Sequence, residues 1–315
     1  MKLRKVVALL LCVVLAFSLV ACNSGETNNG TDAKDESKDN VITDITGHEV
    51  KVPEKIERVV VLSAGECEIV YALGAGNLVV GRGEYCNYPE EVANVEAVKS
   101  GSETNLEQII GLNPDLVIMS YMDQTEEQVA ALEKAGISVC LTKETNIDGV
   151  YKSIEVLGKL LGKETEAAKV VKEMQDTFAD LQDKVAKLDE SEKGKSVYFE
   201  VSPLQYGLWT AGADTYMNEI AEMLGLKNAF ADISGWAEVS EEQVVERNPD
   251  YIVTITMYFG EGPTPEEEIL GRKGWNGMDA IKNKAVYNAN SDEISRPGPR
   301  LADAAEMLYE FVYGE

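Results

Sequence analysis

The most informative pattern of polar and apolar positions is a twelve-residue stretch that occurs twice. Residues 107–118 read EQIIGLNPDLVI, and residues 242–253 read EQVVERNPDYIV. Each copy has a short amphipathic stretch, then Asn-Pro-Asp, then a continuous apolar run, which is typical of a helix, a turn and a buried parallel strand. Asn105 and Ser240 precede the copies as N-caps, and each helix must end before its proline. Two such units predict two similar α/β lobes.

A long amphipathic segment separates the two copies. From residue 147 to residue 188, apolar side chains recur at steps of three and four residues, which predicts helices with one buried face. Gly162 should divide this segment into two helices, because glycine is unfavourable inside a helix. The second helix would have about 26 residues and span roughly 39 Å. It is therefore long enough to connect one lobe to the other as a stiff strut.

These patterns predict an α/β protein in which both lobes have a central sheet. Short apolar runs alternate with loops and helices on both sides of the connector, and ligands of such sheets lie beyond the carboxyl ends of the strands. The expected organisation is a signal peptide at 1–21, a tether at 22–40, a first lobe at 41–146, connector helices at 147–190 and a second lobe at 191–315.

The N-terminal residues indicate where the protein works. A basic start is followed by an apolar run over 6–21, which is short for a membrane span and suits a signal peptide. The run ends in Leu-Val-Ala-Cys, which resembles a bacterial lipobox with Cys22 as the acylated residue. Acyl chains on Cys22 would anchor the protein at the outer face of a membrane. Ordinary secretory cleavage near a cysteine is the alternative. Residues 23–40 lack large apolar side chains, which favours a flexible tether.

Charge excludes some partners. The net charge is −26, and it is −29 without the first 21 residues, which carry three basic side chains and no acidic one. Such an acidic chain argues against binding to nucleic acid or to anionic lipid headgroups.

Three cysteines follow the tether, at Cys67, Cys86 and Cys140, so at least one is unpaired. No Cys-x-x-Cys spacing occurs, and neither a zinc ribbon nor a thioredoxin-like site is indicated.

The sequence offers few residues suited to catalysis. His48 is the only histidine, and it lies in a predicted turn, so no Ser-His or Cys-His pair and no histidine-based metal site is expected. Neither GxSxG nor a glycine-rich phosphate loop is present. We expect no catalytic residue, no metal and no cofactor. An extracytoplasmic enzyme and an adhesin are the alternatives from other functional classes.

Aromatic and charged side chains gather in segments that follow predicted strands. The candidate ligand contacts are Tyr85, Tyr206, Trp209, Trp236, Asp292 and Arg296. A concave site with aromatic walls and a few charged groups suits a bulky organic ligand. For Arg300, the alternative to ligand contact is an ion pair with a nearby acid. Trp275 is expected in the core.

Together these features resemble the substrate-binding lipoproteins of ABC importers for iron-siderophores, haem and cobalamin. The resemblance covers nearly all of the chain after the tether and rests on the lipobox, the connector, NLEQIIGLNPDLVI, GWAEVSEEQVVERNPDYIV and RPGPRLADAAEMLYEFV. It implies the class III periplasmic-binding-protein fold, with mainly parallel sheets in two lobes, one long connector helix and a ligand cleft between the lobes. It also implies docking of Glu107 and Glu242 to arginines of an ABC permease, with Glu241 as a less favoured substitute.

Within this family, the cobalamin-binding branch is the most similar locally. GRGEYCNYP places a corrin-contacting tyrosine at Tyr85, GWAEVSEEQ places a tryptophan contact at Trp236, and SDEISRPGPR places Asp and Arg contacts at Asp292 and Arg296. The resemblance implies a non-enzymatic, extracytoplasmic lipoprotein, expected to be a monomer, that delivers cobalamin or a related corrinoid to a permease and its ATPase. A ferric siderophore, or haem with Tyr85 as axial ligand, is the alternative.

Overall fold

The computed structural model describes residues 40–122 and 125–314, which belong to one compact unit. The predicted signal peptide, Cys22 and the tether up to residue 39 lie outside the described residues. Within the described part, no helix is both long and apolar enough to cross a membrane. This part begins with a hairpin of β1 (Val41–Thr43) and β2 (Glu49–Lys51), whose strands pair antiparallel on either side of the turn predicted at His48.

The first sheet has five parallel strands in the order β5-β4-β3-β6-β7. Their bounds are β3 (Val59–Val61), β4 (Val79–Gly83), β5 (Ala97–Val98), β6 (Leu116–Ser120) and β7 (Ser138–Thr142). The helices between them are α2 (Ala64–Ala72), α3 (Leu106–Gly111) and α4 (Thr125–Lys134), with 3₁₀ turns η1 (Gly76–Leu78), η2 (Glu90–Asn94) and η3 (Gly101–Glu103). Successive residues of β3 and β6 enter different hydrophobic clusters, so both faces of the sheet are covered, as continuous apolar runs require.

The second sheet is mixed and has the order β11-β9-β8-β12-β13, with β10 paired beside β8. Strands β8, β12 and β13 are parallel, whereas β9 runs antiparallel to both of its neighbours. The strand bounds are β8 (Ser196–Ser202), β9 (Leu208–Ala211), β10 (Lys227–Asn228), β11 (Trp236–Val239), β12 (Tyr251–Thr254) and β13 (Val286–Asn288). Its helices are α7 (Tyr216–Met223), α8 (Glu241–Arg247), α9 (Pro265–Leu270), α10 (Asp279–Lys282), α11 (Ser291–Ile294) and α12 (Leu301–Tyr313), with the 3₁₀ turn η4 (Leu204–Tyr206).

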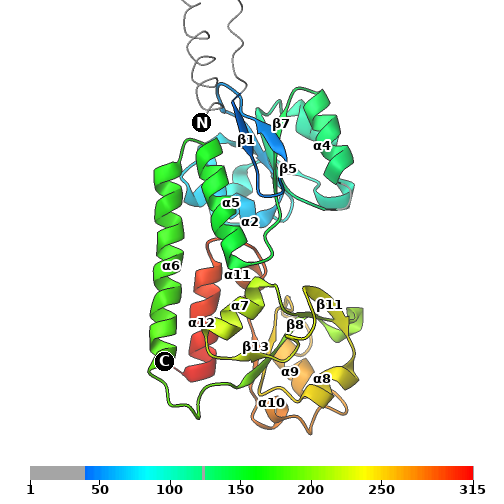
Figure 1. Ribbon diagram of the computed structural model, residues 1–315. Coiled ribbons are helices and arrows are strands. Elements are labelled where there is room, and N and C mark those ends of the chain that lie inside the picture. Colours follow the sequence, from blue (N-terminus) through cyan, green and yellow to red (C-terminus); the bar gives the residue numbers. More distant parts are fainter. Residues whose placement is uncertain (1–39, 123–124, 315) are drawn as a thin grey trace, which may run out of the picture. The chain divides into compact units, whose positions relative to one another are not determined.

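Two helices connect the sheets. The connector consists of α5 (Ile147–Leu160) and α6 (Glu164–Ala186), and they are separated at Gly162, whose φ of 63° is easily adopted only by glycine. The break therefore lies where the sequence predicted it, although α6 is shorter than expected, at 23 residues. Figure 1 shows α6 running alongside α5 at one end and alongside the C-terminal helix α12 at the other.

The repeated stretch forms the same local structure in both lobes. Ser240 and Gln243 form a capping box at α8, and in the other copy the Asn105 side chain accepts a hydrogen bond from the backbone N–H of Gln108 at α3. The asparagine before each proline adopts the left-handed conformation, with φ of 49° at Asn113 and 45° at Asn248. The proline disfavours a right-handed helical conformation there, and asparagine tolerates the left-handed one.

The aspartate of each copy ties its turn to the neighbouring strand. Asp115 accepts hydrogen bonds from the backbone N–H groups of Glu57 and Arg58, at 2.8 and 2.9 Å. Asp250 accepts hydrogen bonds from the backbone N–H and the hydroxyl of Ser196, at 2.8 and 2.9 Å. The shared spacing of the two copies thus reflects one repeated supersecondary unit.

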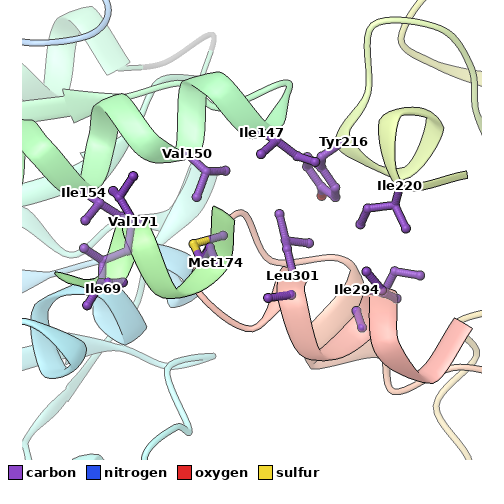
Figure 2. Close-up of a cluster of buried hydrophobic side chains, with 14 of the residues drawn as sticks. Ile69, Ile147, Val150, Ile154, Val171, Met174, Tyr216, Ile220, Ile294 and Leu301 are labelled. Atoms are coloured by element: carbon purple, nitrogen blue, oxygen red, sulfur yellow. The ribbon is translucent and has the colours of Figure 1, made fainter. Parts of the chain in front are cut away.

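One hydrophobic core runs through both lobes and the connector. Figure 2 shows Ile69 of α2, Val150 and Ile154 of α5, and Met174 of α6 in one cluster that continues to Leu301 of α12. On the side of the second sheet the same cluster includes side chains of α7 and α11: Tyr216, Ile220 and Ile294. Separating the lobes would expose this shared apolar surface to water, which is unfavourable, so the connector is part of the core.

Candidate functional site

A cavity of about 680 Å³ lies between segments that follow strands of both sheets. Glu84, Tyr85 and Asn87 follow β4 of the first sheet, whereas residues 256–259 follow β12 and residues 287–292 end β13 and continue beyond it. These are the carboxyl ends of parallel strands, where α/β sheets bind their ligands. The two lobes thus meet at a cavity in the position that the sequence predicted for a cleft.

Large apolar side chains are exposed around this cavity. Tyr85 is 72% exposed and Phe259 is 86% exposed. Met257 and Tyr258, which directly precede Phe259, are also exposed. All four line the cavity. Burying side chains of this size away from water is normally favourable. A contiguous group that stays exposed therefore indicates a binding surface.

The charges in the cavity wall are largely compensated. Arg296 is the one basic side chain among the described residues that line it, and its guanidinium is 2.6 Å from a carboxylate oxygen of Asp292. The same guanidinium donates to the side-chain oxygen of Asn87 at 2.7 Å, and Asn87 in turn donates to Asp292 at 2.8 Å. Arg296 and Asp292 therefore present a neutral, pre-oriented pair of polar groups to the cavity, while Glu84 leaves the wall slightly acidic.

Behind the cavity, a buried carboxylate holds two arginines across the lobes. Glu68 of α2 accepts a hydrogen bond from Arg296 at 3.0 Å and two from Arg300, at 2.6 and 2.9 Å. The three side chains are only 3%, 11% and 13% exposed, and we call them the Glu68 cluster. Arg300 also stacks on the ring of Tyr88, with 4.1 Å from its guanidinium carbon to the ring centroid. Arg300 thus forms the ion pair that the sequence left open as its alternative.

A second cavity, of about 280 Å³, lies in the first lobe and shares Tyr85 with the larger one. Its wall combines apolar side chains with hydroxyl and amide groups: Leu62, Met119, Met122, Ser63, Ser100, Thr104, Ser120, Thr125 and Gln128. None of these described wall residues is charged at neutral pH. The hydroxyl of Ser120 contacts that of Ser63 at 3.0 Å and donates to the buried carboxylate of Glu66 at 2.9 Å.

Glu66 and Glu144 form a carboxyl pair near the start of the connector. Thr142 donates a second hydrogen bond to one oxygen of Glu66, whereas the other oxygen of Glu66 and one oxygen of Glu144 are buried without a hydrogen-bond partner. Burial raises the pKa of Glu144 to about 8, and the negative charge of Glu66 adds to the increase. Glu144 is therefore protonated at neutral pH in the folded protein.

This shift predicts a pH-dependent stability. The unfolded chain releases the Glu144 proton near pH 4.5, but the folded chain keeps it up to about pH 8. The free energy of unfolding should therefore fall as pH rises between these values, by a few kcal/mol in total, at roughly 1.4 kcal/mol for each pH unit. We expect Glu144→Gln to remove this decline in urea titrations at pH 5 and pH 8. The exposed Glu155→Gln on α5 is the control, and an unaltered decline in Glu144→Gln would contradict the assignment.

The predicted contact residues divide into two groups. The structure brings Tyr85, Asp292 and Arg296 together at the larger cavity, whereas Tyr206, Trp209 and Trp236 are not among its described lining residues. Trp209 and Trp236 lie within β9 and β11, which pair antiparallel, and Trp236 packs edge-on against Tyr216. We expected both tryptophans in segments that follow strands, but they lie within strands, which are short and carry no clear two-residue alternation.

The segment that the sequence reading missed is Met257-Tyr258-Phe259. These three apolar residues line the cavity and are exposed, but none was among the candidate contacts. A signal was present, because they begin three residues after the end of β12, at the carboxyl end of a parallel strand. Trp275, by contrast, is 1% exposed, as expected for a core residue.

The two predicted docking glutamates occupy matching positions at the first turns of α3 and α8. Glu107 and Glu242 are exposed. Hydrogen bonds at the helix N-terminus, from its own backbone and from Ser240, lower the pKa of Glu242, so it is ionised at neutral pH. Glu241 instead accepts a hydrogen bond from the indole of the buried Trp275, at 2.9 Å. This contact leaves Glu242 as the available carboxylate in the first turn of the second helix.

The described residues contain no cluster of three or more His, Cys, Asp or Glu side chains that could hold a metal ion. Cys67, Cys86 and Cys140 are free and buried. The larger cavity supplies aromatic surface, the compensated Arg296–Asp292 ion pair and the amide of Asn87. These groups can hold and orient a bulky organic molecule.

The chain matches the profile of the periplasmic binding protein family over residues 59–293. It is 35% identical to an uncharacterized ABC transporter substrate-binding lipoprotein, YvrC, of Bacillus subtilis, over 97% of this chain and 95% of that protein. It therefore belongs to the periplasmic binding protein family. As such it is an extracytoplasmic solute-binding protein of an ABC transporter and not an enzyme, as the sequence predicted.

Two further relatives bear on the ligand. The chain is 26% identical to the vitamin B12-binding protein of Vibrio parahaemolyticus, over 80% of this chain and 87% of that protein. It also resembles the crystal structure of a possible iron-binding, periplasmic solute-binding protein of Staphylococcus epidermidis, with a TM-score of 0.71 and 29% identity over 82% of this chain and 100% of that chain. These matches agree with the predicted class III fold.

Proposed function

We propose that this protein captures cobalamin or a related corrinoid in the cavity between its lobes and delivers it to an ABC permease. The observation that carries the proposal is the group of exposed aromatic and apolar side chains at that cavity, which are Tyr85, Met257, Tyr258 and Phe259. A large, rigid ring system can cover all of them at once. The similarity to a vitamin B12-binding protein supports the same ligand class.

The charges of the cavity favour a ligand without a large negative charge. Arg296 is compensated by Asp292 and by Glu68, and Glu84 adds a further carboxylate to the wall. An anionic ferric siderophore, or haem with its two propionates, would meet more negative than positive charge there. A corrinoid presents mainly amide groups, which can exchange hydrogen bonds with Asn87, Asp292 and Arg296 at little electrostatic cost.

The delivery step uses the outer surfaces of α3 and α8. Glu107 and Glu242 are each followed three residues later by an exposed apolar side chain, Ile110 and Val245. In a helix, residues three apart lie on the same face, so each lobe presents a carboxylate beside an apolar side chain. Such a pair suits a permease surface with an arginine beside an apolar patch. In this proposal Cys22 carries the lipid that keeps the protein, as a monomer, near its permease.

The test is thermal unfolding of the protein with cobalamin, cobinamide, haem and several ferric siderophores. A ligand that binds only the folded state, at a hundred times its dissociation constant, adds about 2.7 kcal/mol and raises the midpoint by several degrees. We expect the increase with the corrinoids. An increase with siderophores alone would transfer the same mechanism to iron, which the similarity to a possible iron-binding protein makes the second candidate. No increase with any of them would contradict both.

Truncation of Phe259 should weaken binding of the ligand found in this way. Phe259→Ala removes an exposed ring from the cavity wall, and the lost aromatic contact and apolar burial should reduce affinity by roughly 10-fold. Trp236→Ala is the comparison variant, because Trp236 is also an exposed aromatic residue, at 40%, but is not in the described wall of the cavity. Isothermal titration would measure both variants. Equal affinity of Phe259→Ala and the unmodified protein would place the ligand elsewhere.

A further inference from the structure

Two of the three described cysteines follow neighbouring strands of the first sheet. Cys67 lies on α2, directly after β3, and Cys86 lies in the turn directly after β4. Strands β3 and β4 are parallel and paired, with Val61 beside Arg82, so the segments that follow them leave the sheet side by side. Both cysteines belong to the same hydrophobic cluster, at 0% and 1% exposure.

The two side chains also influence each other. Their interaction raises the pKa of Cys67 and lowers that of Cys86. Cys86 Sγ also lies 3.8 Å from the carbonyl oxygen of Val61, the last residue of β3. Two buried cysteines of one cluster, on segments that leave the sheet from paired strands, are therefore placed where a disulfide bond can join them.

We propose that Cys67 and Cys86 form a disulfide bond when the protein is outside the cytoplasm. Extracytoplasmic compartments favour disulfides over thiols. The oxidant would be a low-molecular-weight or protein disulfide. While the chain folds and both cysteines are still accessible, the Cys86 thiolate attacks one of its sulfur atoms and releases a thiolate. Cys67 then loses its proton, attacks the Cys86 sulfur of the mixed disulfide and releases the second thiolate. Two cysteine thiols are oxidised, and one disulfide is reduced to two thiols.

The bond would join two segments that meet at the ligand cavity. Cys86 lies between Tyr85 and Asn87, which line the cavity, and Cys67 lies between Glu66 and Glu68. Asn87 and Glu68 both accept hydrogen bonds from Arg296 of the other lobe. A Cys67–Cys86 disulfide would therefore hold together the two parts of the first lobe that grip Arg296, and it would limit movement of the Tyr85 loop.

Peptide mapping of the full chain tests this proposal. The protein is refolded from urea in mixtures of oxidised and reduced glutathione, then unfolded in the presence of an alkylating reagent, which blocks free thiols, and digested with trypsin. Cleavage after Arg58, Arg82 and Lys99 puts Cys67 and Cys86 on different peptides, 59–82 and 83–99. We expect most of the chain to yield these two peptides as one disulfide-linked species under oxidising mixtures and as separate alkylated peptides under reducing ones.

Variants make the result specific. Cys140→Ala should leave the linked species unchanged, because Cys140 is buried at another place in the first sheet, on β7. Cys86→Ala should abolish the species and leave Cys67 open to alkylation after unfolding. Complete alkylation of both cysteines in every mixture would overturn the proposal, as would predominant linkage of either one to another cysteine. The measurement needs no ligand, so a failure of the proposed ligand would leave this result unaffected.

Discussion

Reversing the charge of both docking glutamates is expected to abolish uptake while leaving ligand affinity unchanged. Glu107 and Glu242 are exposed at the first turns of matching helices, and the ligand cavity is built from other segments. In the Glu107→Lys/Glu242→Lys variant, each lysine would face the permease arginine that the carboxylate is proposed to meet. Like charges at an interface cost several kcal/mol, so uptake should fall by at least about 100-fold.

Uptake by cells and isothermal titration of the purified protein would measure the two effects separately. The matched control is Glu155→Lys/Glu173→Lys, which changes the net charge equally at exposed positions of the connector helices α5 and α6. We expect the control variant to support normal uptake. The docking role would have to be abandoned if Glu107→Lys/Glu242→Lys either transports normally or loses its affinity for the ligand.

Removing the charge of Glu68 is expected to have the largest effect on stability. Glu68→Gln leaves the buried guanidinium groups of Arg296 and Arg300 without their shared carboxylate, although Asp292 and Glu293 still contact them. Loss of one member of a buried ion pair is strongly destabilising, because the remaining charge has lost its interaction with water. We expect the free energy of unfolding to fall by about 3 kcal/mol.

Urea denaturation at neutral pH would measure this change. Glu293→Gln is the matched control, because Glu293 contacts Arg300 at a longer distance of 3.3 Å and is more exposed than Glu68. Its loss should cost less than about 1 kcal/mol, as for other partly exposed pairs. Similar effects of the two variants would show that Glu68 does not stabilise the contact between the lobes.

The repeated stretch and the connector could be predicted from sequence because each has a strong local cause. Proline after Asn113 and Asn248 fixes where each helix ends, and the left-handed glycine at Gly162 separates α5 from α6. The shape of the second sheet could not be predicted in this way. Strand order and the antiparallel direction of β9 depend on contacts between distant segments, which leave no periodic pattern in a four-residue strand.

The same distinction applies to the ligand site. All of the candidate contacts were predicted from aromatic or charged residues near strand ends, several with local resemblance. Tyr85, Asp292 and Arg296 follow strands whose carboxyl ends meet at the cavity, whereas Trp209 and Trp236 lie within paired strands, outside its described lining. The Glu68 cluster left no signal, because Glu68 and Arg300 are 232 positions apart in the chain.

The continuous core through the connector also has a consequence for transport kinetics. Because α6 and α12 share one buried cluster with both lobes, we expect ligand capture without a large closure, so that the empty and loaded proteins present nearly the same outer surface. An empty copy would then compete with a loaded one for the permease. At a fixed ligand supply, producing more of this protein than the ligand can fill would slow import, so the rate depends on the loaded fraction and not on abundance alone.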